Sequence, residues 1–554
     1  MIRKVLTLFI LLSFSFGLLA QSTNLRVFEI FQEKCASCHD HNAPQSGLDL
    51  QGAGITTEAQ AANVYANIVN ATPGNSFAAG KGYKYIYPGR PDLSYLFRKV
   101  SDGLEQTIHL ETEEEDVMPP TAEPQLTNEE KELIRQWILY GAPANGEVID
   151  EQVIYDYYNV NGLASFPNGA PDPPAESEGF QIKMGPFYLK PAGQQGDELE
   201  YFQKYELDLP ADVDVTRLDI KIATSSHHFI MYDFDNPFYA QNLAQGFRLD
   251  PYHNGIGLVA AVQEAVDLEL PQGTAFIWDN DLVLDLNSHY INYSATNTYQ
   301  AEVYVNVYTQ ASGTAAQEMK TDLLVNDDIY INNNGNEDVE TQVVNDNIGE
   351  AFVWGIMGHT HQWGTGYKVY KRENSTQSDL IYDASCAQGI PGCVSPYFDY
   401  RHIPMRYFEP FLPIMFNFQN GIIHEATYEN NGPFPVWFGP TSDDEMMVMI
   451  LMYTEDTTGV VFENPNALSE IYNPLDEISV FPNPAQDELT FALPLDIGEV
   501  RLRIFDILGR ELIRENNEAG NIIKIQRRGL NDGIYLYRIE DNHGNFKTGK
   551  ILFE

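Results

Sequence analysis

The sequence CASCH occupies residues 35–39, near the start of the chain. Two cysteines three apart, followed at once by a histidine, are the signature of covalent c-type haem attachment. Cys35 and Cys38 would form thioethers with the haem vinyl groups, and His39 would ligate the iron through a ring nitrogen. A zinc site would need further Cys or His ligands at short spacing. The motif therefore predicts a redox protein that carries haem.

The iron needs a second axial ligand, and two residues compete for that position. Residues 117–120 read VMPP, and the prolines stiffen a loop that can present the Met118 thioether to the iron. Methionine also commonly fills gaps in a core, so the role does not follow from residue type alone. Met118 is the favoured ligand and His109 the alternative.

Five histidines of the middle region fall in three places: His227 with His228, then His289, then His359 with His361. In an extended strand His359 and His361 point to the same face, roughly 7 Å apart, from where two imidazoles can converge on one metal. His227 and His228 would point to opposite faces of a regular strand. Joint ligation by these two residues needs a twist, a bulge or a strand end.

A thioether near these histidines would decide which metal they bind. Imidazoles alone suit zinc, copper or iron, whereas an added thioether selects copper, especially Cu(I). Met446 is the candidate, but Met447, Met449 and Met452 follow closely and could form a methionine-rich core strand. Spacing alone does not select among the four.

The elements around the haem motif are predicted to be helices. Apolar residues recur at helical spacing over residues 25–31, and Thr127 with Glu130 forms a capping-box pattern before an apolar stripe that Gly141 ends. We expect two terminal helices that enclose the haem. After a Pro- and Gly-rich stretch at residues 166–179, alternating segments predict strands, with length enough for two β-sandwich domains.

The start and the charge of the chain indicate its compartment and exclude one class of partner. Residues 1–20 carry two basic residues and then an apolar run, which predicts a secretory signal peptide. The chain has 33 basic against 79 acidic residues, so a nucleic acid partner is not expected, because its phosphates would be repelled.

The N-terminal motifs together resemble a single-haem cytochrome c domain. They are CASCH, YPGRPDLSYL at residues 87–96, VMPP and the closing LIRQWILYGAP helix. The resemblance covers roughly a fifth of the chain and implies electron transfer, with no catalysis by the haem itself.

Five motifs of the middle region resemble copper type II, ascorbate-dependent monooxygenases of the peptidylglycine alpha-hydroxylating and dopamine beta-monooxygenase kind. In order they are SHHFIMYDF, NSHYIN, MGHTHQWG, ATYENN and DDEMMVMILMYTED. The resemblance implies that His227, His228 and His289 hold an electron-storing copper. It also implies that His359, His361 and Met446 hold the catalytic copper, where O₂ and substrate bind. Each copper would deliver one electron to O₂ while a substrate C–H bond is hydroxylated.

One family feature is missing from this chain. Family members typically carry a disulfide in which a Cys follows the ligand Met and its partner precedes the TY pair; here those places hold Met447 and Ala426. Cys386 and Cys393 could instead form a local disulfide, which suits an exported protein. The substrate-recognition residues of the animal enzymes have no counterpart that can be placed.

The C-terminal residues differ in composition and pattern from the rest. Short alternating segments after residue 478 predict a small β-sandwich. The motifs FPNPAQDEL, LGREL and LNDGIYLYRI resemble the type A sorting domain of the type IX secretion system. This implies export to the cell surface or the medium by that machinery, with removal of the tail.

The predicted fold class is a multidomain protein: an all-α cytochrome c domain, two mainly antiparallel, jelly-roll-like β-sandwich copper domains, and a small β-sandwich tail. The expected boundaries are 1–20 for the signal peptide, 25–145 for the cytochrome c domain, 146–177 for a linker, 178–325 and 326–460 for the two copper-domain halves, and 474–554 for the sorting domain.

The predicted function is that of an exported copper-dependent monooxygenase whose c-type haem relays electrons to two copper ions. Its partners would be O₂, a small-molecule or peptide substrate, an external electron donor and the type IX secretion machinery. The alternative is a surface electron-transfer protein that binds haem and copper without hydroxylase activity. A purely adhesive surface protein would leave the haem motif and the ordered histidines unexplained.

Overall fold

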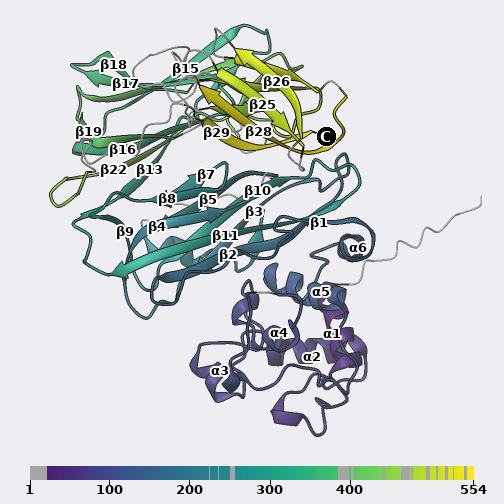
Figure 1. Cartoon of the computed structure of the whole chain (residues 1–554). Coiled ribbons are helices and arrows are strands. Elements are labelled where there is room, and N and C mark those ends of the chain that lie inside the picture. The colour runs from purple at the N-terminus through teal and green to yellow at the C-terminus, as the bar shows by residue number, and fades with distance from the viewer. Residues whose placement is uncertain are drawn as a thin grey trace, which may run out of the picture. The chain divides into compact units, whose positions relative to one another are not determined.

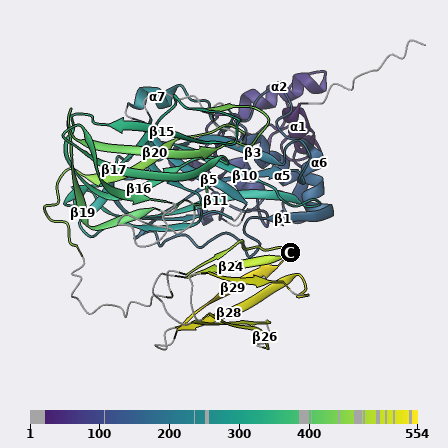
Figure 2. The ribbon, with the colours of Figure 1, turned by 90° about the horizontal axis from the view of Figure 1, so that it is seen from above.

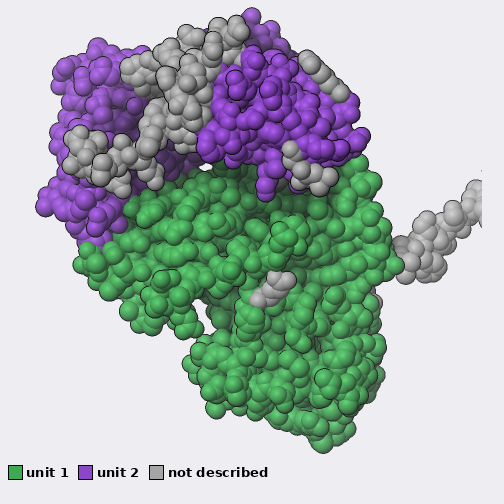
Figure 3. All heavy atoms as spheres, viewed as in Figure 1, with its two compact units in different colours: residues 1–270, 275–314 green, residues 271–274, 315–554 purple. Residues whose placement is uncertain are grey.

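The computed structural model describes residues 22–553 except 106, 224, 235, 250–255, 385–397, 401–402, 404, 440–442, 463–474, 476–477, 494–499, 507–509, 518–521, 528 and 542–545. The predicted signal peptide, residues 1–20, and the predicted disulfide between Cys386 and Cys393 lie outside the described residues. No helix among the described residues is long and apolar enough to cross a membrane. The chain divides into two compact units, residues 1–270 with 275–314 and residues 271–274 with 315–554 (Figure 3).

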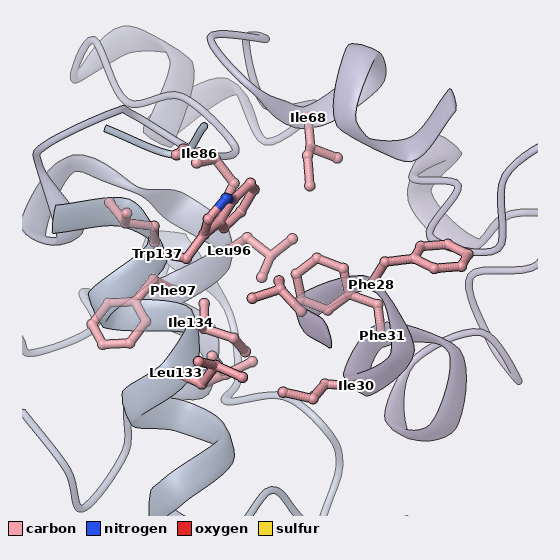
Figure 4. Packing of buried hydrophobic residues seen from close by; sticks show 14 of the residues in the cluster. Phe28, Ile30, Phe31, Ile68, Ile86, Leu96, Phe97, Leu133, Ile134 and Trp137 are labelled. Carbon is pink, nitrogen blue, oxygen red and sulfur yellow. The ribbon is translucent and has the colours of Figure 1, made fainter. Parts of the chain in front are cut away.

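Unit 1 begins with short helices. They are α1 (Thr23–Lys34), η1 (Gln45–Gly47), α2 (Thr57–Ile68), α3 (Ser76–Gly80), η2 (Pro91–Leu93), α4 (Tyr95–Val100), η3 (Thr112–Glu114), α5 (Asn128–Leu139), α6 (Glu151–Asp156) and η4 (Tyr157–Asn161). The Ser22 hydroxyl caps α1 by accepting from the Leu25 N–H, and Thr127 and Glu130 form the predicted capping box of α5. The apolar faces of α1 and α5 meet in a buried core that includes Phe31 and Trp137 (Figure 4).

The remainder of unit 1 consists of antiparallel sheets with one parallel strand pair. The strands are β1 (Gly162–Ala164), β2 (Gly179–Leu189), β3 (Glu198–Glu206), β4 (Val213–Lys221), β5 (Ser226–Phe234), β6 (Phe247–Arg248), β7 (Ile256–Val262), β8 (Val266–Glu269), β9 (Thr274–Trp278), β10 (Val283–Ile291) and β11 (Thr298–Ala311), with helix α7 (Pro237–Gln241) after β5. One sheet has the order β6-β3-β10-β5-β7. In the other, β1, β11, β4 and β9 are neighbours in that order, with β2 also on β11 and β8 on β4 (Figure 1).

Unit 2 contains two four-stranded sheets, of order β13-β22-β16-β19 and β15-β20-β17-β18, and the short pair β14-β21. The strands are β12 (Gln317–Glu318), β13 (Lys320–Val325), β14 (Tyr330–Ile331), β15 (Glu337–Val344), β16 (Gly349–His359), β17 (Gly364–Glu373), β18 (Thr376–Asp383), β19 (Arg406–Phe416), β20 (Gly421–Glu429), β21 (Val436–Trp437) and β22 (Val448–Thr454).

The C-terminal part of unit 2 forms two further sheets, of order β23-β24-β27 and β26-β25-β28-β29 (Figure 2). Their strands are β23 (Ser479–Phe481), β24 (Glu488–Ala492), β25 (Val500–Phe505), β26 (Glu511–Asn517), β27 (Ile522–Gln526), β28 (Gly533–Asp541) and β29 (Phe546–Phe553). They enclose an apolar core of their own that includes Phe491, Leu502 and Ile539.

The predicted fold class is wrong. The chain is mostly β-sheet, 44% strand against 15% helix, arranged as many small sheets, and its few helices do not make an all-α cytochrome domain. The helical segment also contains isolated parallel bridges, such as Val69 with Ile86, and it belongs to the same compact unit as strands β1 to β11. Local periodicity predicted the two terminal helices, which the structure has as α1 and α5, but it carries no information on whether helices close a separate core.

Buried charges join this helical segment to the sheet beside it. Arg135 of α5 pairs with Glu132 in the same helix and, at 2.7 Å, with Glu105. Lys183 of β2 reaches Glu105 at 2.7 Å and Glu302 of β11 at 3.0 Å. Burial alone would raise the pKa of Glu105, but Lys183 and Arg135 outweigh it and hold that pKa far below its usual range. The network is therefore charged and mutually dependent.

Replacing Arg135 should destabilise unit 1 strongly. In Arg135→Met, Glu132 and Glu105 stay buried after losing a cationic partner, so we expect a loss of about 3–5 kcal/mol in the free energy of unfolding. Because the folded pKa of Glu105 is depressed, its contribution is present above the ordinary carboxyl pKa of 4.5 and fades as the pH falls below it. Urea unfolding at pH 7 and pH 4 measures both effects.

The exposed pair of Arg217 with Asp267 supplies the control for this experiment. Their side chains are 34% and 51% exposed, so Arg217→Met should cost less than about 1 kcal/mol. Equal losses in the two variants would contradict a stabilising role for the buried network.

Candidate haem and metal sites

A cavity of about 350 Å³ lies beside the CASCH motif in unit 1. Cys35, Cys38, His39 and Met118 all line it, together with apolar side chains such as Leu50. The structure therefore brings both predicted thioether positions and two predicted iron ligands to one hollow. Burial raises the pKa of the Cys35 thiol to about 12, as expected for a sulfur packed in apolar surroundings.

The His39 ring is oriented by one hydrogen bond. Its Nδ1 lies 3.0 Å from the carbonyl oxygen of Leu48. A carbonyl can only accept, so Nδ1 carries the proton and Nε2 carries the lone pair. The backbone holds this loop in place, because the Leu50 N–H donates to the His39 carbonyl at 2.9 Å. His39 is thus arranged as a ligand through Nε2.

The structure separates the two candidates for the second axial position. Met118 lines the cavity, is 37% exposed, and is anchored by its N–H, which donates to the Lys99 carbonyl at 2.7 Å. His109 is not among the residues that line the cavity; its carbonyl accepts a hydrogen bond from Arg98. The geometry favours Met118.

His227, His228 and His289 come together on neighbouring strands β5 and β10, with one ring nitrogen from each within 4.8 Å of the others. His289 pairs with His228, whereas the next residue, Tyr290, pairs with Ser226. His227 is therefore the extra residue of an irregularity at the start of β5. This is the distortion that joint ligation by two consecutive histidines requires, and it turns both rings to one place.

Polar partners fix which nitrogens point into this group. Nε2 of His289 lies 2.9 Å from a Glu198 oxygen, and Nε2 of His228 lies 2.8 Å from the Asn287 side-chain oxygen and 3.2 Å from Glu200. Oxygen acceptors require an N–H, so Nδ1 of each ring carries the lone pair. Nδ1 of His289 is buried and makes no hydrogen bond within the described part of the chain. A metal ion would satisfy that atom, so the residues fit a metal.

The partners of these imidazoles were missed by the sequence analysis. Glu198 and Glu200 lie on β3, which is next to β10, and Asn287 lies two residues before His289. The carboxylate of Glu200 accepts from Asn287 at 3.0 Å; burial would raise its pKa, but hydrogen bonding to His228 lowers it to about 2. The alternating Glu-Leu-Glu of β3 was the one available signal, and it depends on a strand register that spacing does not reveal.

His359 and His361 form a second pair at the end of β16 in unit 2. Their ring centroids are 5.3 Å apart and the planes are nearly perpendicular, at 87°. Nδ1 of His361 lies 3.1 Å from the Asp444 carbonyl oxygen, which assigns the proton to Nδ1 and the lone pair to Nε2. The same contact brings the segment before Met446 against the histidine pair.

Burial distinguishes Met446 from the methionines that follow it. Met447, Met449 and Met452 are 0%, 0% and 2% exposed, and so belong to the core. Met446 is only partly buried, and its carbonyl accepts from the Tyr428 hydroxyl at 2.7 Å. Of the four candidates left open by spacing, Met446 is the one in a position to supply a thioether outside the core.

Glu445 holds the histidine loop and Met446 together, which the sequence did not indicate. Its buried carboxylate accepts from the backbone N–H groups of His361 at 2.8 Å, Trp363 at 2.6 Å and Met446 at 3.2 Å. Burial raises its pKa to about 7, and these backbone donors act against that rise. One side chain thus fixes the position of His361 relative to Met446.

Removing the Glu445 carboxylate should loosen only the metal site in unit 2. We expect Glu445→Ala to lower copper affinity there roughly 10- to 100-fold, since supporting groups around metal ligands commonly contribute that much. Cu(I) titration of the full chain against a competing chelator measures the change.

Glu455→Ala is the matched control, because Glu455 is 69% exposed and pairs with Lys320 at the surface. If Glu445→Ala binds copper at the unit 2 site as tightly as the wild-type protein does, the histidine loop does not need this carboxylate.

Comparison with known families assigns the C-terminal part of the chain. Residues 479–554, which comprise β23 to β29, match the family described as the secretion system C-terminal sorting domain. This part is a type IX sorting domain, so the protein is exported to the cell surface or secreted, and it engages the type IX secretion machinery.

Among curated proteins, the chain is similar to an endo-acting ulvan lyase of Formosa agariphila. The two are 32% identical over 77 residues, which is 14% of each chain. The similarity therefore spans a small part of that relative.

Solved structures give weak similarity only. A peptide-N(4)-(N-acetyl-beta-D-glucosaminyl) asparagine amidase matches with 11% identity and a TM-score of 0.22, covering 51% of this chain and 98% of that one. A β-glucuronidase of Ruminococcus gnavus matches with 10% identity and a TM-score of 0.14, covering 66% of this chain and 46% of that one. Scores this low assign no common fold.

Proposed function

We propose that the protein is an exported copper-dependent monooxygenase that hydroxylates a C–H bond of an organic substrate with O₂. The observation that carries this proposal is the convergence of His227, His228 and His289 on one point. Three imidazoles held by carboxylate and amide partners are a donor set that suits copper. The second donor set, with its thioether, suits Cu(I) in particular.

The two donor sets suit different tasks. His227, His228 and His289 provide imidazole nitrogens alone, and oxygen acceptors on β3 and β10 orient two of the rings, which suits a centre that only stores an electron. His359, His361 and Met446 mix nitrogen with a weak thioether, which leaves room for exchangeable ligands. Copper bound at these sites would supply the one-electron steps and the activation of O₂.

The haem is proposed as the electron supply. Cys35 and Cys38 would attach it, while His39 Nε2 and the Met118 thioether would ligate the iron and favour its reduced state. The cavity beside the motif and the first histidine group both belong to unit 1. We therefore propose that the haem delivers electrons to this histidine group first.

Copper stoichiometry with oxygen uptake tests the proposal. The mature protein should bind two copper ions per haem and consume O₂ when given ascorbate, and His289→Ala, His359→Ala or Met446→Ala should abolish uptake. His41→Ala is the control, because His41 is a half-exposed histidine outside both groups.

Two results would contradict hydroxylation. A protein that retains no copper has no such activity. A protein that binds haem and copper but takes up no O₂ with any candidate substrate is instead a surface electron-transfer protein.

The haem assignment has a separate test. Met118→Ala should remove the far-red sulfur–iron charge-transfer band of the oxidised haem and lower its potential, while His109→Ala should change neither. Cys35→Ser with Cys38→Ser should give protein without covalent haem in a pyridine haemochrome assay. If His109→Ala removes the band and Met118→Ala does not, the ligand assignment is wrong.

A further inference from the structure

Three polar side chains share the inner face of one sheet in unit 2. Gln342 of β15 lies directly opposite His424 of β20, and Tyr367 of β17 lies opposite Ala426, two residues from His424. Residues two apart on a strand point to the same face, so Tyr367, His424 and Gln342 form a row across three neighbouring strands. None of them belongs to the proposed copper sites.

Hydrogen bonds along this row fix the position of every proton. Gln342 donates through its side-chain nitrogen to the Val325 carbonyl at 3.0 Å, so its oxygen faces His424 Nε2 at 2.6 Å. That oxygen only accepts, hence Nε2 of His424 carries the proton and Nδ1 carries the lone pair. The Tyr367 hydroxyl, 2.6 Å from Nδ1, therefore donates to it.

Two members of the row, Tyr367 and His424, are shielded from solvent, whereas Gln342 is partly buried. Tyr367 and His424 are both 0% exposed. Burial lowers the pKa of His424 to about 4 and raises that of Tyr367 well above its usual value. At neutral pH the pair is thus a neutral phenol that donates a hydrogen bond to a neutral imidazole.

The Tyr367 ring also packs against the strand that carries His359. A Cβ added at Gly358, the residue before His359, would lie 2.4 Å from atoms of the Tyr367 ring. Only a residue without a side chain allows this approach between the ring and the backbone of β16. The Tyr367 ring thus contacts Gly358, the residue that precedes a proposed copper ligand.

We propose that Tyr367 and His424 form a redox-active pair, in which the phenol gives up one electron to a strong oxidant and its proton to Nδ1 of the imidazole. The phenolic O–H bond breaks, an N–H bond forms at Nδ1, the oxidant gains the electron, and a neutral tyrosyl radical remains beside an imidazolium. Nε2–H still donates to Gln342, which stabilises that cation. The proton stays on His424, so reduction restores the phenol.

The weak basicity of His424 determines which oxidants can oxidise the Tyr367 phenol. A poor proton acceptor makes the phenol hard to oxidise, so the pair responds only to strong one-electron oxidants. Its role, which rests on the proposed function, is to supply an electron when O₂ activation at the His359 site proceeds without substrate. The close contact at Gly358 places the Tyr367 ring against the strand that carries His359.

The pair is tested in copper-free full-length protein, so its failure is distinct from failure of the copper function. Photogenerated tris(bipyridine)ruthenium(III) serves as the oxidant, and electron paramagnetic resonance follows the radical. We expect a tyrosyl signal that outlives those of exposed tyrosines at least tenfold. Tyr367→Phe should remove this long-lived signal and His424→Gln should shorten its life at least tenfold.

Tyr382→Phe is the matched control, because Tyr382 is also fully buried and its ring lies 6.5 Å from that of Tyr367. It should retain the long-lived signal. A second readout needs no variant: in wild-type protein carrying ¹⁵N-histidine, the radical should show coupling to one imidazole nitrogen. A long-lived signal that persists in Tyr367→Phe, or a radical without imidazole coupling, would overturn the proposal.

Discussion

A neutral imidazole has one N–H and one lone pair, and the proposed haem and copper sites depend on how that constraint is met. In His39, His228, His289 and His361 an oxygen acceptor takes the N–H of one ring nitrogen. The remaining nitrogen then carries the lone pair, in a direction set by the rest of the fold. A ligand ring that is held in one tautomer and one orientation has little freedom to lose when a metal binds.

The acceptors come from different parts of the chain, which explains why the sites need a folded sheet. For His289 and His228 they lie on strand β3 and on β10 itself, so the pairing of β3, β10 and β5 builds the site. For His361 the acceptor is a backbone carbonyl of the segment that leads to Met446. Glu445 then ties that segment to the loop by accepting from the backbone N–H groups of His361 and Trp363.

Sequence reasoning was most informative for residues that lie close together in the chain. The adjacent His227 and His228 could share a metal only at a twist, a bulge or a strand end, and β5 has such an irregularity there. The haem role of Cys35, Cys38 and His39 stays a prediction. Sequence reasoning failed for residues whose role depends on which strands and loops become neighbours. The roles of Glu198, Glu200 and Glu445 depend on which strands and loops become neighbours, and a lone carboxylate in a chain with 79 acidic residues carries no such signal. The fold class was wrong for the same reason, since local helix patterns say nothing of whether helices close a core alone.

The same constraint separates the proposed ligand histidines from His424. His424 has both ring nitrogens engaged, one by the Tyr367 hydroxyl and one by the Gln342 oxygen, so it has no lone pair to offer a metal. Burial lowers its pKa to about 4, and it stays neutral at physiological pH. What remains available to it is exchange of the proton in the bond to Tyr367. Because both ring nitrogens of His424 are hydrogen-bonded, this histidine suits proton transfer. His289 has one hydrogen-bonded nitrogen, so its other nitrogen suits a metal.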